Sequence, residues 1–207
     1  MNVDLATLLI TALVALLAGA MLGWRLRGTR GTRHEVSPVV AADAPLIYDT
    51  LTGLYSPQVA IETLVRQLHL ADRLKHAVTV LVIEVDGPAE APVPDEVLQS
   101  VAACLLRRVR KYDVLCRWKQ ARFLIISPDS DVGSALVLAQ DLVEGVARVP
   151  LQGAQGAVAV TVSVGVHSRR THRPDSQPEV APEMIAAAIR ALDVSRAHGP
   201  GRIEIEP

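Results

Sequence analysis

The stretch Val160-Thr161-Val162-Ser163-Val164-Gly165-Val166 is the part of the sequence that best indicates how this chain folds. Valine occupies every second position, with Thr161 and Ser163 between valines. β-Branched residues of this kind are enriched in strands, where their side chains pack well on a pleated surface. We therefore predict a β-strand from about residue 157 to residue 166.

Further strand and helix patterns lie around this stretch. Strands are predicted at residues 78–85, 114–118, 123–127 and 202–206, and helices at 56–75, 94–109, 131–146 and 182–197. The run 78–85 is largely apolar, which is typical of a strand buried on both faces. Ser56 and Pro57 suit the first residues of a helix, and Gly199-Pro200-Gly201 suits the end of one. The predicted fold class is α/β (α+β), with a central mixed sheet flanked by helices.

The N-terminus carries a separate signal. The twenty residues from Leu5 to Trp24 include no charged side chain, and at about 1.5 Å per residue they span ~30 Å, the thickness of a bilayer core. A cleaved signal peptide is the alternative, since Ala18-Gly19-Ala20 resembles a cleavage site, but Asp4 is the only charge before the run. Arginines follow the run at positions 25, 27, 30 and 33. The positive-inside rule then predicts a transmembrane helix at residues 1–24 with its N-terminus outside, a cytoplasmic linker at 25–45, and a cytoplasmic domain at 46–207.

Charge and cysteine content exclude several classes of function. The net charge of −1 gives no electrostatic case for binding nucleic acid. Cys104 and Cys116 lie in apolar surroundings without metal-ligand spacing, so we expect them to be core residues in a reducing compartment. No zinc spacing, Ser-His-Asp order or phosphate-binding glycine loop appears in the sequence.

Four motifs occur in a characteristic order. They are Asp49-Thr50-Leu51-Thr52-Gly53-Leu54-Tyr55-Ser56, Arg110-Lys111-Tyr112-Asp113, the valine-rich strand, and Ala188-Ile189-Arg190-Ala191-Leu192. Together they resemble the GGDEF domain, the diguanylate cyclase family of bacterial signalling, over residues from about Tyr48 to Ile205. That family condenses two GTP molecules into cyclic di-GMP. The resemblance implies a nucleotide-cyclase-like fold and, with the predicted span, a place in the bacterial inner membrane.

The sequence departs from the family at its signature hairpin. The family reads Gly-Gly-Asp-Glu-Phe there, whereas this chain has Lys119, Gln120, Ala121, Arg122 and Phe123, so only the phenylalanine remains. Cyclisation needs a divalent metal. The resemblance places one metal carboxylate in an Asp-x-Asp pair, which here reads Glu84-Val85-Asp86, and the second carboxylate in the hairpin, where none is found. We therefore expect no metal site, no cofactor and no enzymatic activity.

Two arrangements are open for Arg122. It faces Glu84 and supplies a fixed positive charge where the family holds a metal ion, or it points into solvent from a hairpin strand. In either arrangement, an arginine at this position repels a divalent cation.

Arg110 and Asp113 also allow two interpretations. In the family this Arg-x-x-Asp pair is the product-inhibition site, where the arginine meets a phosphate or guanine of cyclic di-GMP and the aspartate accepts from guanine. Arginine forks match such groups well. The alternative is that Arg110 complements the dipole of the preceding helix and Asp113 makes a turn.

We expect a catalytically inactive, membrane-anchored regulatory protein that acts by binding, with cyclic di-GMP at Arg110 and Asp113 as the candidate ligand. The alternative is a structural or accessory subunit that docks onto a larger membrane complex without a nucleotide. Protein partners considered are such a complex, a second copy of the chain and another GGDEF domain; no nucleic acid is expected.

Overall fold

The computed structural model describes residues 46–87, 92–149, 151–153, 156–158, 160–170 and 177–206. The chain divides into two units, Met1–Ala44 and Pro45–Pro207. The predicted transmembrane helix at 1–24 and linker at 25–45 lie outside the described residues. Within the ranges given above, no helix is both long and apolar enough to cross a bilayer.

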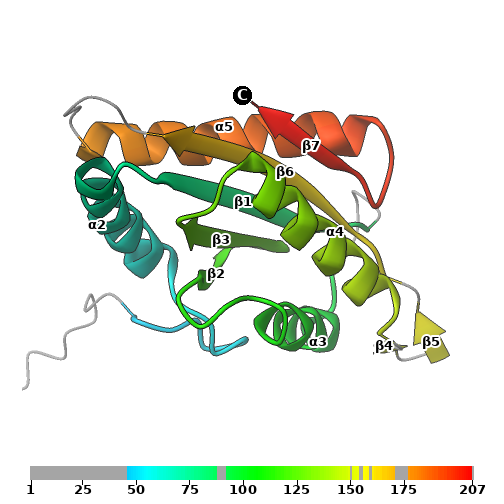
Figure 1. The fold of residues 1–207 in the computed structure, drawn as a ribbon. Coiled ribbons are helices and arrows are strands. Elements are labelled where there is room, and N and C mark those ends of the chain that lie inside the picture. Colours follow the sequence, from blue (N-terminus) through cyan, green and yellow to red (C-terminus); the bar gives the residue numbers. More distant parts are fainter. Residues whose placement is uncertain are drawn as a thin grey trace, which may run out of the picture. The chain divides into compact units, whose positions relative to one another are not determined.

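A five-stranded mixed sheet forms the centre of the second unit, in the order β2-β3-β1-β6-β7 (Figure 1). The strands are β1 (Ala77–Val85), β2 (Val114–Lys119), β3 (Arg122–Pro128), β6 (Val162–Arg170) and β7 (Ile203–Glu206). β1 lies in the middle and pairs antiparallel with β3 and with β6. Only β7 runs parallel to its neighbour, β6. A separate two-stranded ladder joins β4 (Leu151–Gly153) to β5 (Gly156–Val158).

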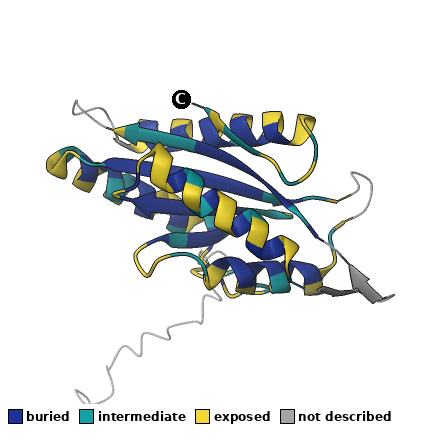
Figure 2. Cartoon of the chain, turned by 45° about the vertical axis from the view of Figure 1, so that its right-hand side comes forward, coloured by how far each residue is buried: buried dark blue, intermediate teal, exposed yellow. Residues whose placement is uncertain are grey.

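Among the described residues, four helices cover the two faces of the sheet. They are α2 (Pro57–Leu74), α3 (Asp95–Leu106), α4 (Val132–Ala147) and α5 (Gln177–Ala197). The buried side chains of α2 and α5 pack in one cluster and those of α3 and α4 in another, on opposite faces of the sheet. Figure 2 shows the buried sheet between helices whose outer faces are exposed.

The alternation of side chains along β1 explains this layering. Leu81 and Ile83 belong to the cluster with α3 and α4, whereas Val80 and Val82 belong to the cluster with α2 and α5. Successive strand residues point to opposite faces, so an all-apolar strand can serve both cores. The prediction that β1 is buried on both faces is confirmed. Phe123, the one hairpin residue shared with the family, is fully buried in the first cluster.

Three predicted elements have different bounds. The valine-rich strand begins at Val162, because residues 156–158 pair with β4, and it continues past its predicted end at residue 166 to Arg170. The extension occurs because Ala77 to Val80 of β1 supply backbone partners for residues 167–170. α3 was predicted to reach residue 109 but ends at Leu106, so Arg110 lies beyond the last turn of the helix. α5 begins at Gln177, and Pro182 lies inside it.

Candidate functional site

The turn between β2 and β3 lies beside the end of β1. β2 and β3 are joined by Gln120 and Ala121, and Gln120 takes a left-handed φ of 49°. Such a conformation favours glycine, the residue that the family pattern has at this position. The turn is held nonetheless, because the Arg117 side chain donates to the Gln120 carbonyl at 2.8 Å and the Val85 amide donates to the Ala121 carbonyl at 3.1 Å. The register of the ladder sets Glu84 directly opposite Arg122.

Arg122 faces Glu84, which decides between the two arrangements left open by the sequence. Its Nε donates to Glu84 Oε2 at 2.7 Å. Glu84 Oε1 is 3.2 Å from Nη1 of Arg196 on α5. Arg122 Nη2 also lies 3.6 Å from Asp193 Oδ1. The Glu84 side chain is only 15% exposed, so these ion pairs form at a partly buried corner.

Asp86 is held by three donors. Its Oδ2 accepts from Thr161 Oγ1 at 2.7 Å and from the Gly201 amide at 2.9 Å, and its Oδ1 accepts from Ser163 Oγ at 2.7 Å. This carboxylate therefore joins the end of β1 to β6 and to the turn before β7. The sequence analysis listed Asp86 only as a position of the degenerate site and did not find this role, because its partners lie far along the chain.

The donor set at this corner does not fit a divalent metal. Magnesium needs carboxylate oxygens that are free to bind it. Both oxygens of Glu84 face guanidinium groups, and both oxygens of Asp86 accept hydrogen bonds. In the part of the chain that the structure describes, no group of three or more His, Cys, Asp or Glu residues is arranged to hold a metal ion.

A cavity of about 400 Å³ opens beside Asp86. Its lining residues are Asp86, Gly87, Thr161, Arg196, Gly199 and Pro200. The sequence analysis did not identify Arg196 as a residue of this corner. The turn after α5, with Gly199 at φ 112° and Gly201 at φ 69°, brings this segment next to β1.

Arg110 and Asp113 have different surroundings. Asp113 is 9% exposed, and its carboxylate accepts from the Arg110 amide at 2.8 Å and from Ser127 Oγ at 2.9 Å. The Arg110 side chain is exposed, and its guanidinium lies 6.0 Å from the centre of the Tyr112 ring. Asp113 thus fixes the turn after α3, while the Arg110 side chain stays accessible.

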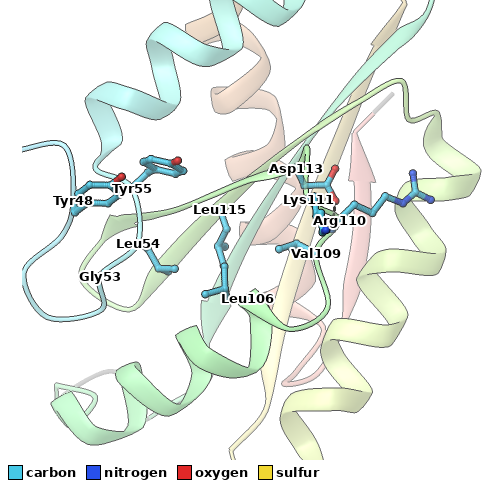
Figure 3. Close-up of a pocket in the computed structure, with 10 residues that line it drawn as sticks. All are labelled: Tyr48, Gly53, Leu54, Tyr55, Leu106, Val109, Arg110, Lys111, Asp113 and Leu115. Carbon is cyan, nitrogen blue, oxygen red and sulfur yellow. Dashed lines mark hydrogen bonds between the residues drawn. The ribbon is translucent and has the colours of Figure 1, made fainter.

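A second cavity, of about 380 Å³, lies between this turn and the entry segment of the domain (Figure 3). Its lining residues are Tyr48, Gly53, Leu54, Tyr55, Leu106, Val109, Arg110, Lys111, Asp113 and Leu115. Tyr48 and Tyr55 stack with ring centres 5.3 Å apart. Figure 3 shows the two tyrosines at one side and Arg110 at the other, with its guanidinium extending away from them. We call this space the Arg110 cavity.

Asp49 positions the two tyrosines. Its Oδ1 accepts from the amide and hydroxyl of Thr52, at 2.8 and 2.6 Å, and lies 3.5 Å from Arg117 Nη1. Burial alone would raise the pKa of Asp49, but the Thr52 hydrogen bonds and the Arg117 charge hold it below its usual value. The carboxylate thereby closes a turn that brings Tyr48 against Tyr55 and Tyr55 against Cys116 of β2. The Asp-x-x-Thr spacing is the sequence signal for such a turn.

Comparisons with known proteins agree with this fold. The family model described as "Diguanylate cyclase, GGDEF domain" matches residues 46–199. The chain is similar to the response regulator PleD of Caulobacter vibrioides, with 30% identity over 131 residues, or 58% of this chain and 28% of PleD. The chain thus spans little more than a quarter of the length of this curated relative.

Solved structures show the same architecture. The GGDEF domain of DgcB from Caulobacter crescentus, solved with c-di-GMP, has a TM-score of 0.66 at 19% identity, covering 77% of this chain and 95% of that one. The diguanylate cyclase SiaD from Pseudomonas aeruginosa, solved with its activator SiaC, has a TM-score of 0.68 at 20% identity, covering 98% of this chain and 76% of that one. At these identities the likeness shows the fold.

The family match contradicts the expectation that this chain is not an enzyme. That expectation rested on Ala121 and Arg122, which replace the hairpin carboxylates. The matched model is that of a diguanylate cyclase domain, and it extends across the hairpin and nearly all of the described unit. The expectation weighed the hairpin substitutions alone, whereas the match also covers the buried core around Phe123 and the turn closed by Asp49.

Proposed function

Because the chain belongs to the GGDEF family of diguanylate cyclase domains, we propose that it serves cyclic di-GMP signalling by binding that nucleotide at the Arg110 cavity. The observation that carries this proposal is the accessible Arg110 side chain at the border of a cavity with two stacked tyrosines. A guanidinium can donate two parallel hydrogen bonds to a phosphate or to the edge of guanine. Lys111 lines the same cavity and adds a second positive charge.

The tyrosines suit the remaining part of the ligand. A guanine base is flat and aromatic, and aromatic side chains stack on bases without needing a particular sequence. Tyr48 is 54% exposed and Tyr55 is 37% exposed, so each ring has accessible surface. Cyclic di-GMP offers both guanines and phosphates, which correspond to the aromatic and cationic sides of the cavity.

In this proposal Asp113 is a positioning residue. Both of its carboxylate oxygens already accept hydrogen bonds within the protein. Its role is to hold the Arg110 backbone at the edge of the cavity. The resemblance alone had implied that this aspartate contacts guanine directly.

The test is calorimetric titration of cyclic di-GMP into the full-length protein in mild detergent. We expect saturable binding that weakens roughly tenfold or more in Arg110→Ala, because a bidentate contact is lost. Arg107→Ala is the matched control: it removes the same charge three residues earlier, outside the cavity lining. A flat titration of the native protein, or equal losses in the two variants, would refute the proposal.

We also propose that the domain is tethered to the inner membrane, on its cytoplasmic side, by the uncharged run Leu5–Trp24. The arginines that follow this run support that orientation. Membrane fractions washed with alkaline carbonate should retain the protein. Its release into the supernatant would count against a transmembrane anchor.

A second candidate function is docking onto a protein partner. Tyr48 and Leu106 line the same cavity and are 54% and 57% exposed, and neighbouring exposed apolar side chains are typical of contact surfaces. SiaD, which shares the fold, was solved with an activator protein. If cyclic di-GMP does not bind, co-purification from membranes that Leu106→Asp abolishes would favour this second function.

A further inference from the structure

We infer that the Arg122 guanidinium takes the place of a divalent cation at the end of β1, and that this fixed charge closes the corner to Mg²⁺ and Mn²⁺. The inference concerns Glu84 and its neighbours, and so it is independent of nucleotide binding at the Arg110 cavity.

The geometry around Glu84 carries the first step. Arg122 approaches one carboxylate oxygen at 2.7 Å and Arg196 approaches the other at 3.2 Å. A cation that bound Glu84 would have to displace both guanidinium groups from a side chain that is only 15% exposed. It would also lie next to two positive charges, and such repulsion is strong in a partly buried site.

Asp86 is a poor alternative ligand, because its carboxylate is already engaged by three donors. It accepts hydrogen bonds from two hydroxyls and one backbone amide, and the Gly201 amide cannot turn away as a hydroxyl can. Asp193, 59% exposed on its side chain, already lies 3.6 Å from Arg122. The charged groups at this corner thus satisfy one another without a metal.

Backbone structure fixes Arg122 in this position. It lies directly opposite Glu84 in the ladder of β1 and β3, and side chains at such paired positions are within reach of each other. A carboxylate placed at position 122 would therefore stand beside Glu84. Two adjacent carboxylates are a common ligand set for Mg²⁺ or Mn²⁺. Replacement of Arg122 by a carboxylate residue should therefore create a cation site beside Glu84.

Manganese binding tests the inference, measured on the full-length protein by the loss of the electron paramagnetic resonance signal of free Mn²⁺. We expect no saturable site in the native chain up to roughly 1 mM Mn²⁺. Arg122→Glu should gain one saturable site with a Kd at least about tenfold below that concentration. Adding Glu84→Gln should remove this site. Arg107→Glu makes the same charge change elsewhere and should gain no site.

Two results would overturn the inference. One is a saturable Mn²⁺ site in the native protein that Glu84→Gln abolishes. The other is Arg122→Glu protein that has native circular dichroism but binds Mn²⁺ no better than Arg107→Glu. If Arg122→Glu does not fold, Arg122→Gln removes the positive charge without adding a negative one. It should then bind Mn²⁺ more tightly than the native chain, and equal binding would also overturn the inference.

Discussion

Asp86 matches the second aspartate of the family's Asp-x-Asp pair, but its contacts in this chain give it a structural role. Its carboxylate accepts hydrogen bonds from Thr161 Oγ1, Ser163 Oγ and the Gly201 amide. These hydrogen bonds are partly buried, and donors that lose their acceptor in such a site carry a desolvation cost. Replacement of Asp86 should therefore loosen the junction of β1, β6 and the turn before β7.

We expect Asp86→Ala to lower the free energy of unfolding by about 3 kcal/mol, since several donors are left without a partner. Urea unfolding followed by circular dichroism measures this change. Asp129→Asn is the control, because Asp129 is exposed and asparagine tolerates its left-handed φ of 47°. Equal midpoints for the two variants would show that the Asp86 hydrogen bonds contribute little.

Residues near one another in sequence were the easier ones to interpret. The substitutions from Lys119 to Arg122 are evident from the sequence alone. Of the two arrangements considered for Arg122, the structure has the one in which it faces Glu84. The partners of Asp86 lie 75, 77 and 115 residues away. No local sequence pattern predicts contacts over such distances along the chain. The role of Asp86 could therefore be found only in the three-dimensional structure.

At the scale of elements, the contact of α5 with the sheet depends on Gly165. A Cβ atom at this position would lie 2.1 Å from the Ala188 carbonyl oxygen and 2.2 Å from the Leu192 nitrogen. These are backbone atoms of a long helix, so they cannot move aside as a side chain can. The glycine permits α5 to lie close against β6.

Gly165→Ala should therefore destabilise the protein by about 3 kcal/mol or more, the upper part of the range for overpacked cores. Gly133→Ala on α4 is the matched control. The nearest atom to its Cβ would be 3.7 Å away, and alanine in a helix is favoured by about 0.5 kcal/mol over glycine. Thermal unfolding of both variants distinguishes them; a native melting temperature for Gly165→Ala would contradict the packing argument.

Element types were predictable from sequence, whereas several ends were not. The apolar periods at β1 and α4 gave elements close to those observed. The extension of β6 to Arg170 follows from backbone pairing with Ala77. The hydrophobic pattern of the sequence does not predict such pairing. The β4–β5 ladder was likewise not predicted, because three-residue strands carry too little pattern.

At the scale of the whole molecule, several carboxylates have pKa values below their usual range. They are Asp49, Asp131, Glu144 and Glu206. The backbone amide of Ser134 is the main cause for Asp131, and the Arg190 side chain is the main cause for Glu206. A group whose pKa is lower in the folded state stabilises that state above its unfolded pKa. This stability is lost as the pH falls through the folded value.

We therefore expect the melting temperature to fall as the pH is lowered below about 4. Circular dichroism melts at pH 7, 5, 4 and 3 measure this dependence. Asp49→Asn should show a smaller fall between the last two conditions, because one of the titrating groups has been removed. An unchanged melting temperature down to pH 3 would contradict the prediction.

β7 has a consequence for anyone who shortens this protein. It forms the outer strand beside β6, where the Val164 amide donates to the Arg202 carbonyl at 2.8 Å and the His167 ring meets the Glu206 carbonyl at 2.9 Å. A truncation after Arg202 would leave the backbone groups of β6 open along that side. Exposed strand backbones recruit strands from other molecules. Shortened preparations would then aggregate during purification, although every residue of both proposed sites was still in place.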